Sequence, residues 1–503
     1  MTRPETSGER RAFDRSGDTT VTSFDGTKLV VHFFPVPNLA KGHRAPTVMM
    51  GPGWGAGGDT NPEGDDFTAA GGISIHTLNR AGYNVLTWDP RGFGKSSGTI
   101  EVDHPDYEGR DAQVIVDWLA AQPEAQLDAK GDPRLGMAGG SYGGAIQLIL
   151  AARDCRVDAI TPTIAWHSLV TSLDKADIVK YGWASLLYRG AAGHQLDSHV
   201  ESGFTAGRTN APLPQADRDW FAAHGPGDEL IGRITIPTLI VQGTVDTLFT
   251  LDEGISNYKV LRSKGVPVSM LWFCGGHGIC LTKAGDETRV AKAVLAWLAR
   301  YVQHKSSTKV GPRFDTVDQN GKRYTAADYP APSDGSVTAD GAGTLQLVDG
   351  GGAGPAQVPA GSGGALAGIA ASITPSPAPN AVDVPITFDR KAVVVGAPKL
   401  TLSYRGTAGA GDAPTRVFAQ LVDEKTGVVL GTQITPVDVT LDGAAHETTV
   451  PLEAVVFTGD PSSKVKLQLV ATTTAYAKPR LGGQVQFDRI HVELPVGKVT
   501  PAR

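Results

Sequence analysis

Cysteine is scarce in this chain, with three residues among 503, and this excludes a fold stapled by many disulfides. Long apolar runs are also missing, because no stretch approaches the ~18 residues that a membrane-spanning helix needs. The 46 basic and 52 acidic residues are interspersed and give a net charge of −6. The sequence contains no basic patch of the kind that would predict nucleic-acid binding. We therefore expect neither nucleic acid nor a membrane as a partner, and the oligomeric state stays open.

The first 18 residues contain no apolar segment of the kind found in secretory signal peptides. We expect a cytoplasmic protein, or a secreted one whose leader was removed before the numbering begins. Cys274 and Cys280 flank the segment CGGHGIC. Two reduced thiols are the favoured interpretation, and a disulfide is the alternative if the compartment oxidises. A C-x5-C spacing without a second pair is not a zinc signature, and we expect no metal and no cofactor.

Strand and helix patterns alternate over most of residues 1–308. A hairpin pattern covers 19–36, and a helix is predicted near 69–81. Alternating buried strands and helices predict a parallel sheet covered on both faces. Residues 163–230 break the alternation and are interpreted as a small helical cap. The fold class predicted for 1–308 is therefore α/β.

The character of the chain changes after residue 308. Residues 349–381 are rich in Gly, Pro, Ala and Ser and are expected to be irregular. Short strand patterns separated by turn residues follow, for example TRVFAQLVDE and KVKLQLVAT. This spacing predicts an all-β sandwich or jelly roll over 309–503.

Ser141 stands in the Gly-rich stretch MAGGSYGGA, residues 137–145. The pattern G-x-S-x-G is typical of the nucleophile elbow of α/β-hydrolases, in which a strand, a sharp turn and a helix follow one another. A second match contains Ser96, but no apolar helix follows it. Ser141 has an apolar strand before it and the apolar run AIQLILAA after it, so Ser141 is the predicted nucleophile. Ser96, with Asp89 and Arg91, is expected to order a loop by hydrogen bonds.

A serine hydroxyl needs a base, and the base needs a carboxylate to orient it. In α/β-hydrolases the acid and then the histidine follow the serine along the chain. Asp246 lies in the loop past the end of the strand PTLIVQG, and His277 lies in the loop past the end of the strand VPVSMLWF. Both lie where the carboxyl ends of parallel strands meet, so Ser141, Asp246 and His277 form the predicted triad.

An oxyanion hole needs two hydrogen-bond donors. The backbone N–H of Tyr142, next to the nucleophile, is one candidate. The other is the backbone of Trp54 in the loop GPGWGAGG, where Gly53 and Gly55 allow a close approach. The alternative for this loop is a Gly-rich turn with a packing tryptophan.

The segments GGSYGG and WDPRGFGKSSG, together with the β-rich C-terminal half, resemble the cocaine-esterase and X-prolyl dipeptidyl-peptidase family. The resemblance covers roughly residues 20–495 and implies an α/β-hydrolase with a jelly-roll domain that works through an acyl-enzyme. Many members supply an oxyanion donor from a tyrosine in a P-Y-G turn. GPGWGAGG has no tyrosine, so a backbone amide must take its place.

Three functions compete. An esterase acting on a carboxylic ester is favoured, an X-Pro dipeptidyl peptidase is the alternative, and a non-catalytic binding protein comes third. The expected partner is a small ester or a short peptide. A dipeptidyl peptidase must bind an α-ammonium group. The carboxylates available for this in the cap are Asp174, Asp177, Asp197 and Glu201, although a solvated helix face is the plainer interpretation. His167 and His194 are expected to be ordinary polar residues.

Overall fold

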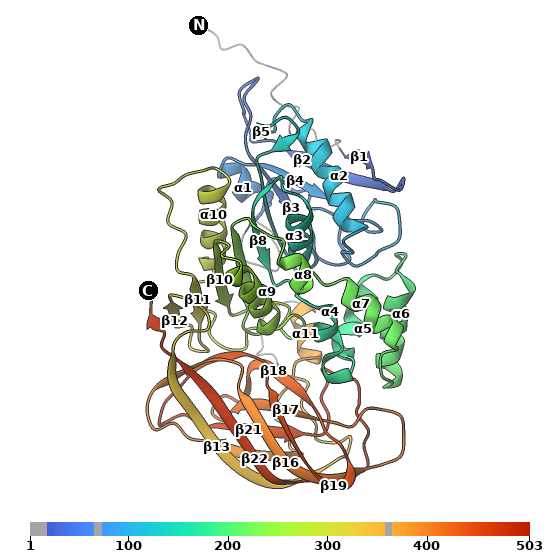
Figure 1. Cartoon of the computed structure of the whole chain (residues 1–503), viewed down its shortest axis with the longest axis vertical. Helices are drawn as coiled ribbons and strands as arrows, with labels where there is room; N and C mark the ends of the chain where they lie inside the picture. Colours follow the sequence, from blue (N-terminus) through green and yellow to red (C-terminus); the bar gives the residue numbers. More distant parts are fainter. Residues whose placement is uncertain (1–17, 65–72, 358–364, 503) are drawn as a thin grey trace.

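The computed structural model describes residues 18–64, 73–357 and 365–502 of the chain. Figure 1 shows three parts: a large sheet with helices on both faces, a group of short helices at its side, and a β-rich part below them. None of the described helices is long and apolar enough to cross a membrane.

A large sheet of eleven strands forms the centre of the first part, in the order β1-β2-β4-β3-β7-β8-β9-β10-β11-β12-β23. From β4 to β11 neighbouring strands run parallel, as predicted from the apolar runs of β4 to β10. The antiparallel pair β1 and β2 confirms the hairpin predicted over 19–36. The strands are β1 (Thr19–Thr22), β2 (Lys28–Phe34), β3 (Thr47–Met50), β4 (Asn84–Trp88), β7 (Leu135–Gly140), β8 (Val157–Thr163), β9 (Thr238–Gly243), β10 (Val268–Phe273), β11 (Phe314–Val317), β12 (Arg323–Ala326) and β23 (Thr500–Pro501). A separate two-stranded hairpin joins β5 (Leu127–Ala129) and β6 (Asp132–Pro133).

Helices cover both faces of this sheet (Figure 1). The helices α1 (Ile75–Arg80) and α10 (Arg289–Tyr301) bury Leu78 and Trp297 in one core. The helices α2 (Glu108–Ala120), α3 (Tyr142–Arg153) and α9 (Leu251–Ser263) bury their apolar faces in a core on the opposite side. The predicted helix over 69–81 begins later, at Ile75, because Ser74 caps it by accepting from the Thr77 N–H. Residues 69–72 lie outside the described residues.

Short helices occupy the segment predicted as a cap. They are α4 (Leu169–Leu173), the 3₁₀ turn η2 (Lys175–Asp177), α5 (Tyr181–Gly190), α6 (Ser198–Thr209), α7 (Gln215–Ala223) and α8 (Gly227–Ile231). Apolar side chains of α4, α5, α6 and α7 share a core with residues of the large-sheet part and of the β-rich part, including Tyr142, Phe249 and Phe418. The cap therefore lies where all three parts of the chain meet.

Two antiparallel sheets pack face to face in the C-terminal part, around a core that includes Leu402, Leu421 and Leu467. One sheet has the order β19-β16-β22-β15-β20, with β13 also paired to β22, and the other has the order β14-β21-β17-β18. The strands are β13 (Ser333–Gln346), β14 (Ala381–Ile386), β15 (Ala392–Gly396), β16 (Lys399–Ala408), β17 (Arg416–Asp423), β18 (Val428–Asp438), β19 (Asp442–Pro451), β20 (Val455–Gly459), β21 (Val465–Val470) and β22 (Gly483–Gly497). The whole is an α/β-hydrolase fold followed by a β-sandwich.

Two features differ from the sequence expectations. The helix α11 (Ala365–Ser372) lies within the stretch 349–381 that was predicted to be irregular. Its sequence ALAGIAAS is rich in alanine, the strongest helix former, and this local preference outweighs the surrounding glycine and proline. The strands β11 and β12 follow residue 308 yet extend the large sheet past β10, and β23 from the chain's end pairs with β12. Strands from both sides of residue 308 therefore share one sheet.

Candidate active site

Ser141 occupies the sharp turn between β7, which ends at Gly140, and α3, which begins at Tyr142. Its backbone has φ +59° and ψ −120°, a conformation that non-glycine residues rarely adopt and that is found at functional sites. A Cβ atom at Gly143 would lie 2.1 Å from the carbonyl oxygen of Gly51. Glycine is thus required there for α3 to pack against the loop that follows β3, and the turn lifts the Ser141 hydroxyl to the end of the sheet.

The structure brings the three predicted side chains together. Ser141 Oγ lies 2.7 Å from His277 Nε2, and His277 Nδ1 lies 2.8 Å from Asp246 Oδ2. An ionised carboxylate only accepts hydrogen bonds, so we assign the imidazole proton to Nδ1. Nε2 is then free to accept the proton of the Ser141 hydroxyl.

The Asp246 carboxylate is fully buried, and hydrogen bonds compensate for its loss of water. Oδ1 accepts from the backbone N–H groups of Leu248 and Phe249 over 3.0 and 2.9 Å. Oδ2 accepts from the backbone N–H of His277 over 3.1 Å as well as from its ring. The acid is therefore fixed by its own loop and by the histidine loop.

The loop that carries His277 is closed by a disulfide between Cys274 and Cys280. The interpretation of two reduced thiols was wrong. Glycines at 275, 276 and 278 let the loop turn back, and the two Cα atoms lie 5.5 Å apart, within the range that a disulfide spans. The imidazole itself packs edge-on against Trp183 and Phe249, with ring centroids 5.7 and 5.1 Å away.

Tyr142 directly follows Ser141, and Trp54 lines the same pocket as the serine. In the described part of the chain, the backbone N–H groups of Tyr142 and Trp54 have no hydrogen-bond acceptor. Tyr142 opens α3, so the positive end of that helix faces the site. The Trp54 ring has a further contact that the sequence did not predict: its Nε1–H donates to the Leu187 carbonyl over 2.9 Å. This bond ties the loop after β3 to the cap helix α5.

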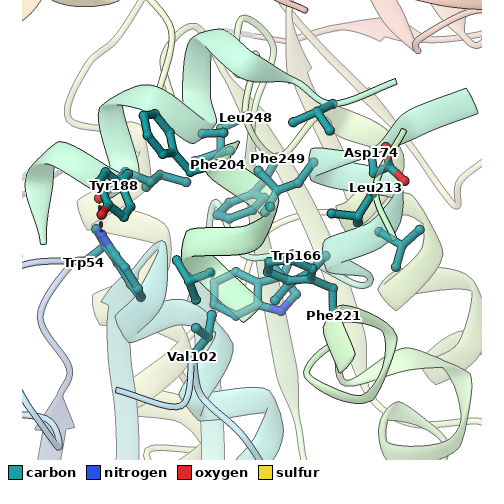
Figure 2. A pocket seen from close by; sticks show the side chains of 18 of the residues that line it. Trp54, Val102, Trp166, Asp174, Tyr188, Phe204, Leu213, Phe221, Leu248 and Phe249 are labelled. Atoms are coloured by element: carbon teal, nitrogen blue, oxygen red, sulfur yellow. Dashed lines mark hydrogen bonds between the residues drawn. The ribbon is translucent and has the colours of Figure 1, made fainter. Parts of the chain in front are cut away.

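Ser141 lines an apolar pocket formed by residues of the large-sheet part and of the cap. Figure 2 shows the pocket with the aromatic and aliphatic side chains around it. Besides Ser141, most of its lining is aromatic or aliphatic: Trp54, Val102, Tyr142, Trp166, Leu169, Val170, Leu173, Val179, Ala184, Leu187, Tyr188, Val200, Gly203, Phe204, Leu213, Phe221, Leu248 and Phe249. Asp174 is the charged exception. Its Oδ2 pairs with Arg218 Nη2 over 2.6 Å, while its buried Oδ1 has no hydrogen-bond partner. Burial raises the pKa of this carboxyl to about 6.

Comparison with known proteins identifies the family of this chain. The model of the X-Pro dipeptidyl-peptidase (S15) family matches residues 25–279. The chain belongs to this S15 family. It is therefore an enzyme of the serine-hydrolase type, as predicted, and the third alternative, a binding protein without catalysis, is wrong. No curated protein sequence matches it significantly.

Two solved structures share the fold of this S15 chain over nearly its whole length. A CocE/NonD family hydrolase from Staphylococcus aureus superposes with a TM-score of 0.69 at 13% identity, covering 95% of this chain and 93% of the other. An aminopeptidase from the marine sediment archaeon Thaumarchaeota archaeon superposes with a TM-score of 0.67 at 14% identity, covering 98% of both chains. At these identities the likeness establishes the fold.

The other residues considered from the sequence lie elsewhere in the S15 chain. Ser96 accepts from the Val30 N–H and donates to the Asp89 carbonyl over 2.9 and 2.7 Å, which confirms its predicted role in ordering the loop. The His194 Nδ1 lies 2.8 Å from the Gly92 carbonyl oxygen, outside the pocket lining. His167, Asp177, Asp197 and Glu201 are also absent from that lining. Among the described residues, no cluster of His, Cys, Asp or Glu is arranged to hold a metal ion.

Proposed function

We propose that this S15-family enzyme hydrolyses carboxylic esters with an apolar acyl group, using Ser141, His277 and Asp246 as a catalytic triad. One observation carries the proposal: the Ser141 Oγ, 2.7 Å from His277 Nε2, lines an apolar pocket. A nucleophile activated by a base is therefore part of the wall of a cavity that would remove the apolar group of a substrate from water.

The mechanism follows from the hydrogen bonds. His277 Nε2 removes the hydroxyl proton as Ser141 Oγ attacks the ester carbonyl. The imidazolium then passes this proton to the leaving alcohol, and an acyl-enzyme remains on Ser141. Asp246 stays ionised and stabilises the imidazolium through Nδ1. Water, activated by the same imidazole, releases the acid and restores the serine.

Negative charge develops on the carbonyl oxygen in each tetrahedral intermediate. In the proposal, the backbone N–H groups of Tyr142 and Trp54 donate to this oxygen. Both are free of other acceptors in the described chain, and the α3 N-terminus adds a favourable dipole. Donors held in place before the reaction lose no energy to reorganisation, which is why such sites are effective.

The lining of the pocket favours an ester over a peptide. A peptide entering the pocket would bring backbone N–H and carbonyl groups, each of which needs a partner once it leaves water. The pocket offers aromatic and aliphatic surface along nearly all of its wall. An alkyl or aryl acyl chain needs no such partners and gains from burial, by roughly 0.8 kcal/mol per CH₂ group.

A second candidate, an X-Pro dipeptidyl peptidase, is favoured by Asp174. Its Oδ1 is buried and unpartnered, and Asp174 is one of the residues that line the pocket (Figure 2). A substrate ammonium could satisfy it, as the first residue of a peptide would require. Arg218 already pairs with the other oxygen of Asp174 and compensates its charge, so we rank this candidate second.

The test compares p-nitrophenyl hexanoate with Gly-Pro-p-nitroanilide, using wild type, Ser141→Ala and Asp174→Asn. We expect ester turnover by wild type, none by Ser141→Ala, and ester turnover by Asp174→Asn close to that of wild type. Turnover of the anilide alone, with its loss in Asp174→Asn, would favour the peptidase instead. Ester turnover that survives in Ser141→Ala would refute the proposed mechanism.

A further inference from the structure

Side chains from two other parts of the chain hold the loop that carries Asp246. Lys180 Nζ donates to the carbonyl oxygens of Thr247 and Leu248 over 3.0 and 3.1 Å. Gln433 Nε2 donates to the carbonyl oxygen of Asp246 over 2.8 Å. Lys180 precedes α5 in the cap, and Gln433 lies on β18 in the C-terminal part. Three consecutive backbone carbonyls after β9 are thus held by side chains.

The Lys180 bonds act on the same peptide groups that hold the acid. In a planar trans peptide, the carbonyl of one residue and the N–H of the next move together. Lys180 binds the carbonyls of Thr247 and Leu248, and the N–H groups of the same two peptides, on Leu248 and Phe249, donate to Asp246 Oδ1. Fixing the two carbonyls therefore fixes the two donors that orient the carboxylate.

Gln433 reaches the loop because β18 bulges at this point. Gln420 of β17 faces Ile434, and Val422 faces Val429, so residues 430–433 of β18 lie opposite a single residue of β17. Bulges of this kind re-aim side chains and are frequent beside active sites. Since a carbonyl oxygen only accepts, the amide nitrogen of Gln433 must face Asp246.

The backbone of the bulge is strained at Thr432. This β-branched residue has φ +54°, in the left-handed region that such residues rarely adopt. Its hydroxyl lies 3.0 Å from the Val245 carbonyl oxygen, directly before Asp246. Strain at a defined contact is retained where the surrounding structure enforces it, commonly at functional sites.

Lys180 is buried, and in the described structure its Nζ donates hydrogen bonds to these two carbonyls alone. Its side chain is 3% exposed, and burial lowers its pKa to about 8 against the raising effect of Glu453, Glu253 and Asp246, while Lys175 lowers it further. Near neutral pH it therefore remains an ammonium, which makes stronger hydrogen bonds than a neutral amine. The Tyr476 ring lies 5.8 Å from Nζ and adds a cation–π contact from the C-terminal part.

We propose that Lys180 and Gln433 are positioning residues for the reaction, which hold the loop 245–248 so that the Asp246 carboxylate stays against His277. The inference rests on the proposed function, because it assigns the two residues an effect that passes through Asp246. It also gives the cap and the C-terminal part a shared role. Each contributes one side chain that holds the loop of Asp246, while the triad itself lies in the large-sheet part.

The experiment measures kcat and KM for p-nitrophenyl hexanoate in Lys180→Met and Gln433→Leu, each in the wild-type and Asp246→Asn backgrounds. In the wild-type background we expect kcat to fall about tenfold or more while KM changes less than about twofold. The substitutions should weaken the stabilisation of the transition state and leave the binding of the substrate unchanged. In the Asp246→Asn background we expect each variant to change kcat by less than about twofold, because residues that act through one another are not additive.

Gln468→Leu is the matched control. Gln468 is a buried amide on β21 of the same sheet as Gln433, and it hydrogen-bonds to Ala378 and Gln420 but not to the Asp246 loop. We expect it to lower the melting temperature without lowering kcat. If one of the two test variants fails to fold, the other decides, since the two act from different parts of the chain.

Unchanged kcat in the test variants, or equal losses in both backgrounds, would overturn the inference. If Ser141→Ala remains active, the proposed function fails, and the positioning role that rests on it fails too. If Ser141→Ala is inactive and the test variants match wild type, the positioning role alone fails.

Discussion

His277 makes two hydrogen bonds to one oxygen of Asp246: its ring Nδ1 lies 2.8 Å from Oδ2, and its backbone N–H donates to the same atom over 3.1 Å. The first bond selects the tautomer that leaves Nε2 as the acceptor for Ser141. The second bond ties the histidine loop to the acid loop. Tautomer and ring position are thus set by a single buried oxygen.

Asp246→Asn should therefore disable the base while leaving the fold intact. An amide that donates to Nδ1 would place the imidazole proton on Nε2, facing Ser141, and known triads lose about 10⁴ in kcat in this way. Steady-state kinetics with p-nitrophenyl hexanoate and circular dichroism of the same sample check this. A loss below about tenfold would show that Asp246 does not orient the base.

Gly143→Ala should damage the turn at Ser141. Its Cβ would lie 2.1 Å from the Gly51 carbonyl oxygen, so α3 must shift, and overpacking of this kind costs about 1–3 kcal/mol of unfolding free energy. The serine moves with α3, so activity should fall further than stability. Gly350→Ala is the control, because a Cβ there would have no heavy atom within 4 Å. Urea unfolding and ester kinetics measure both effects, and a variant with wild-type stability and activity would contradict the packing argument.

Leu213→Trp should change the choice of acyl chain. Leu213 lies beside Asp174 in the pocket wall (Figure 2), and a larger side chain there shortens the cavity. We expect the ratio of kcat/KM for p-nitrophenyl hexanoate over acetate to fall about tenfold or more, since each methylene lost from a pocket is worth ~1–3 kcal/mol. Leu213→Met conserves the volume and should leave the ratio unchanged. The same ratio in both variants would mean that the acyl chain binds elsewhere.

His224 should make the cap sensitive to acid. Its ring stacks on Trp220 and lies near His104, with centroids 3.6 and 4.4 Å away. Its Nδ1 donates to the Trp220 carbonyl, its buried Nε2 has no partner, and burial lowers its pKa to about 3. A folded pKa below the unfolded value of ~6.5 means that the unfolded state binds the proton first. The stability contributed by neutral His224 is therefore fully present above pH ~6.5 and is lost as the pH falls from ~6.5 toward 3.

The check compares urea unfolding at pH 7.5 and pH 5 for wild type and His224→Phe. We expect wild type to lose roughly 2 kcal/mol more than the variant between the two pH values, from the proton uptake of one unfolded histidine. His43→Gln, at an exposed position, should lose as much as wild type. Equal losses in wild type and His224→Phe would show that His224 does not govern the acid response.

The sequence predicted those elements whose pattern is local. The apolar strand before Ser141 and the apolar helix after it were visible, as was the order of strands that ends at Asp246 and His277. The strand β13 was missed because SDGSVTADGAGTLQ is rich in glycine and polar residues and forms a strand by pairing with β22. Its conformation is set by its partner strand and not by its own composition.

The sequence could not predict contacts between distant segments. The bond from Trp54 to the Leu187 carbonyl joins residues 133 positions apart, and the Lys180 and Gln433 anchors depend on how the cap and the C-terminal part fold onto the acid loop. A buried lysine before a helix and a glutamine in a strand carry no local signal of such a role. The segment VVLGTQITP carries only a weak signal, because a glycine inside a strand pattern suggests a bulge.

Labelling with a fluorophosphonate tests the central claim most directly, because this probe reacts only with a serine whose hydroxyl is activated. Peptide mass spectrometry of the labelled protein should find the adduct on Ser141 and not on Ser96, with labelling strongly slowed in His277→Ala. An unlabelled Ser141 in folded wild-type protein, or equal labelling rates in wild type and His277→Ala, would contradict the account.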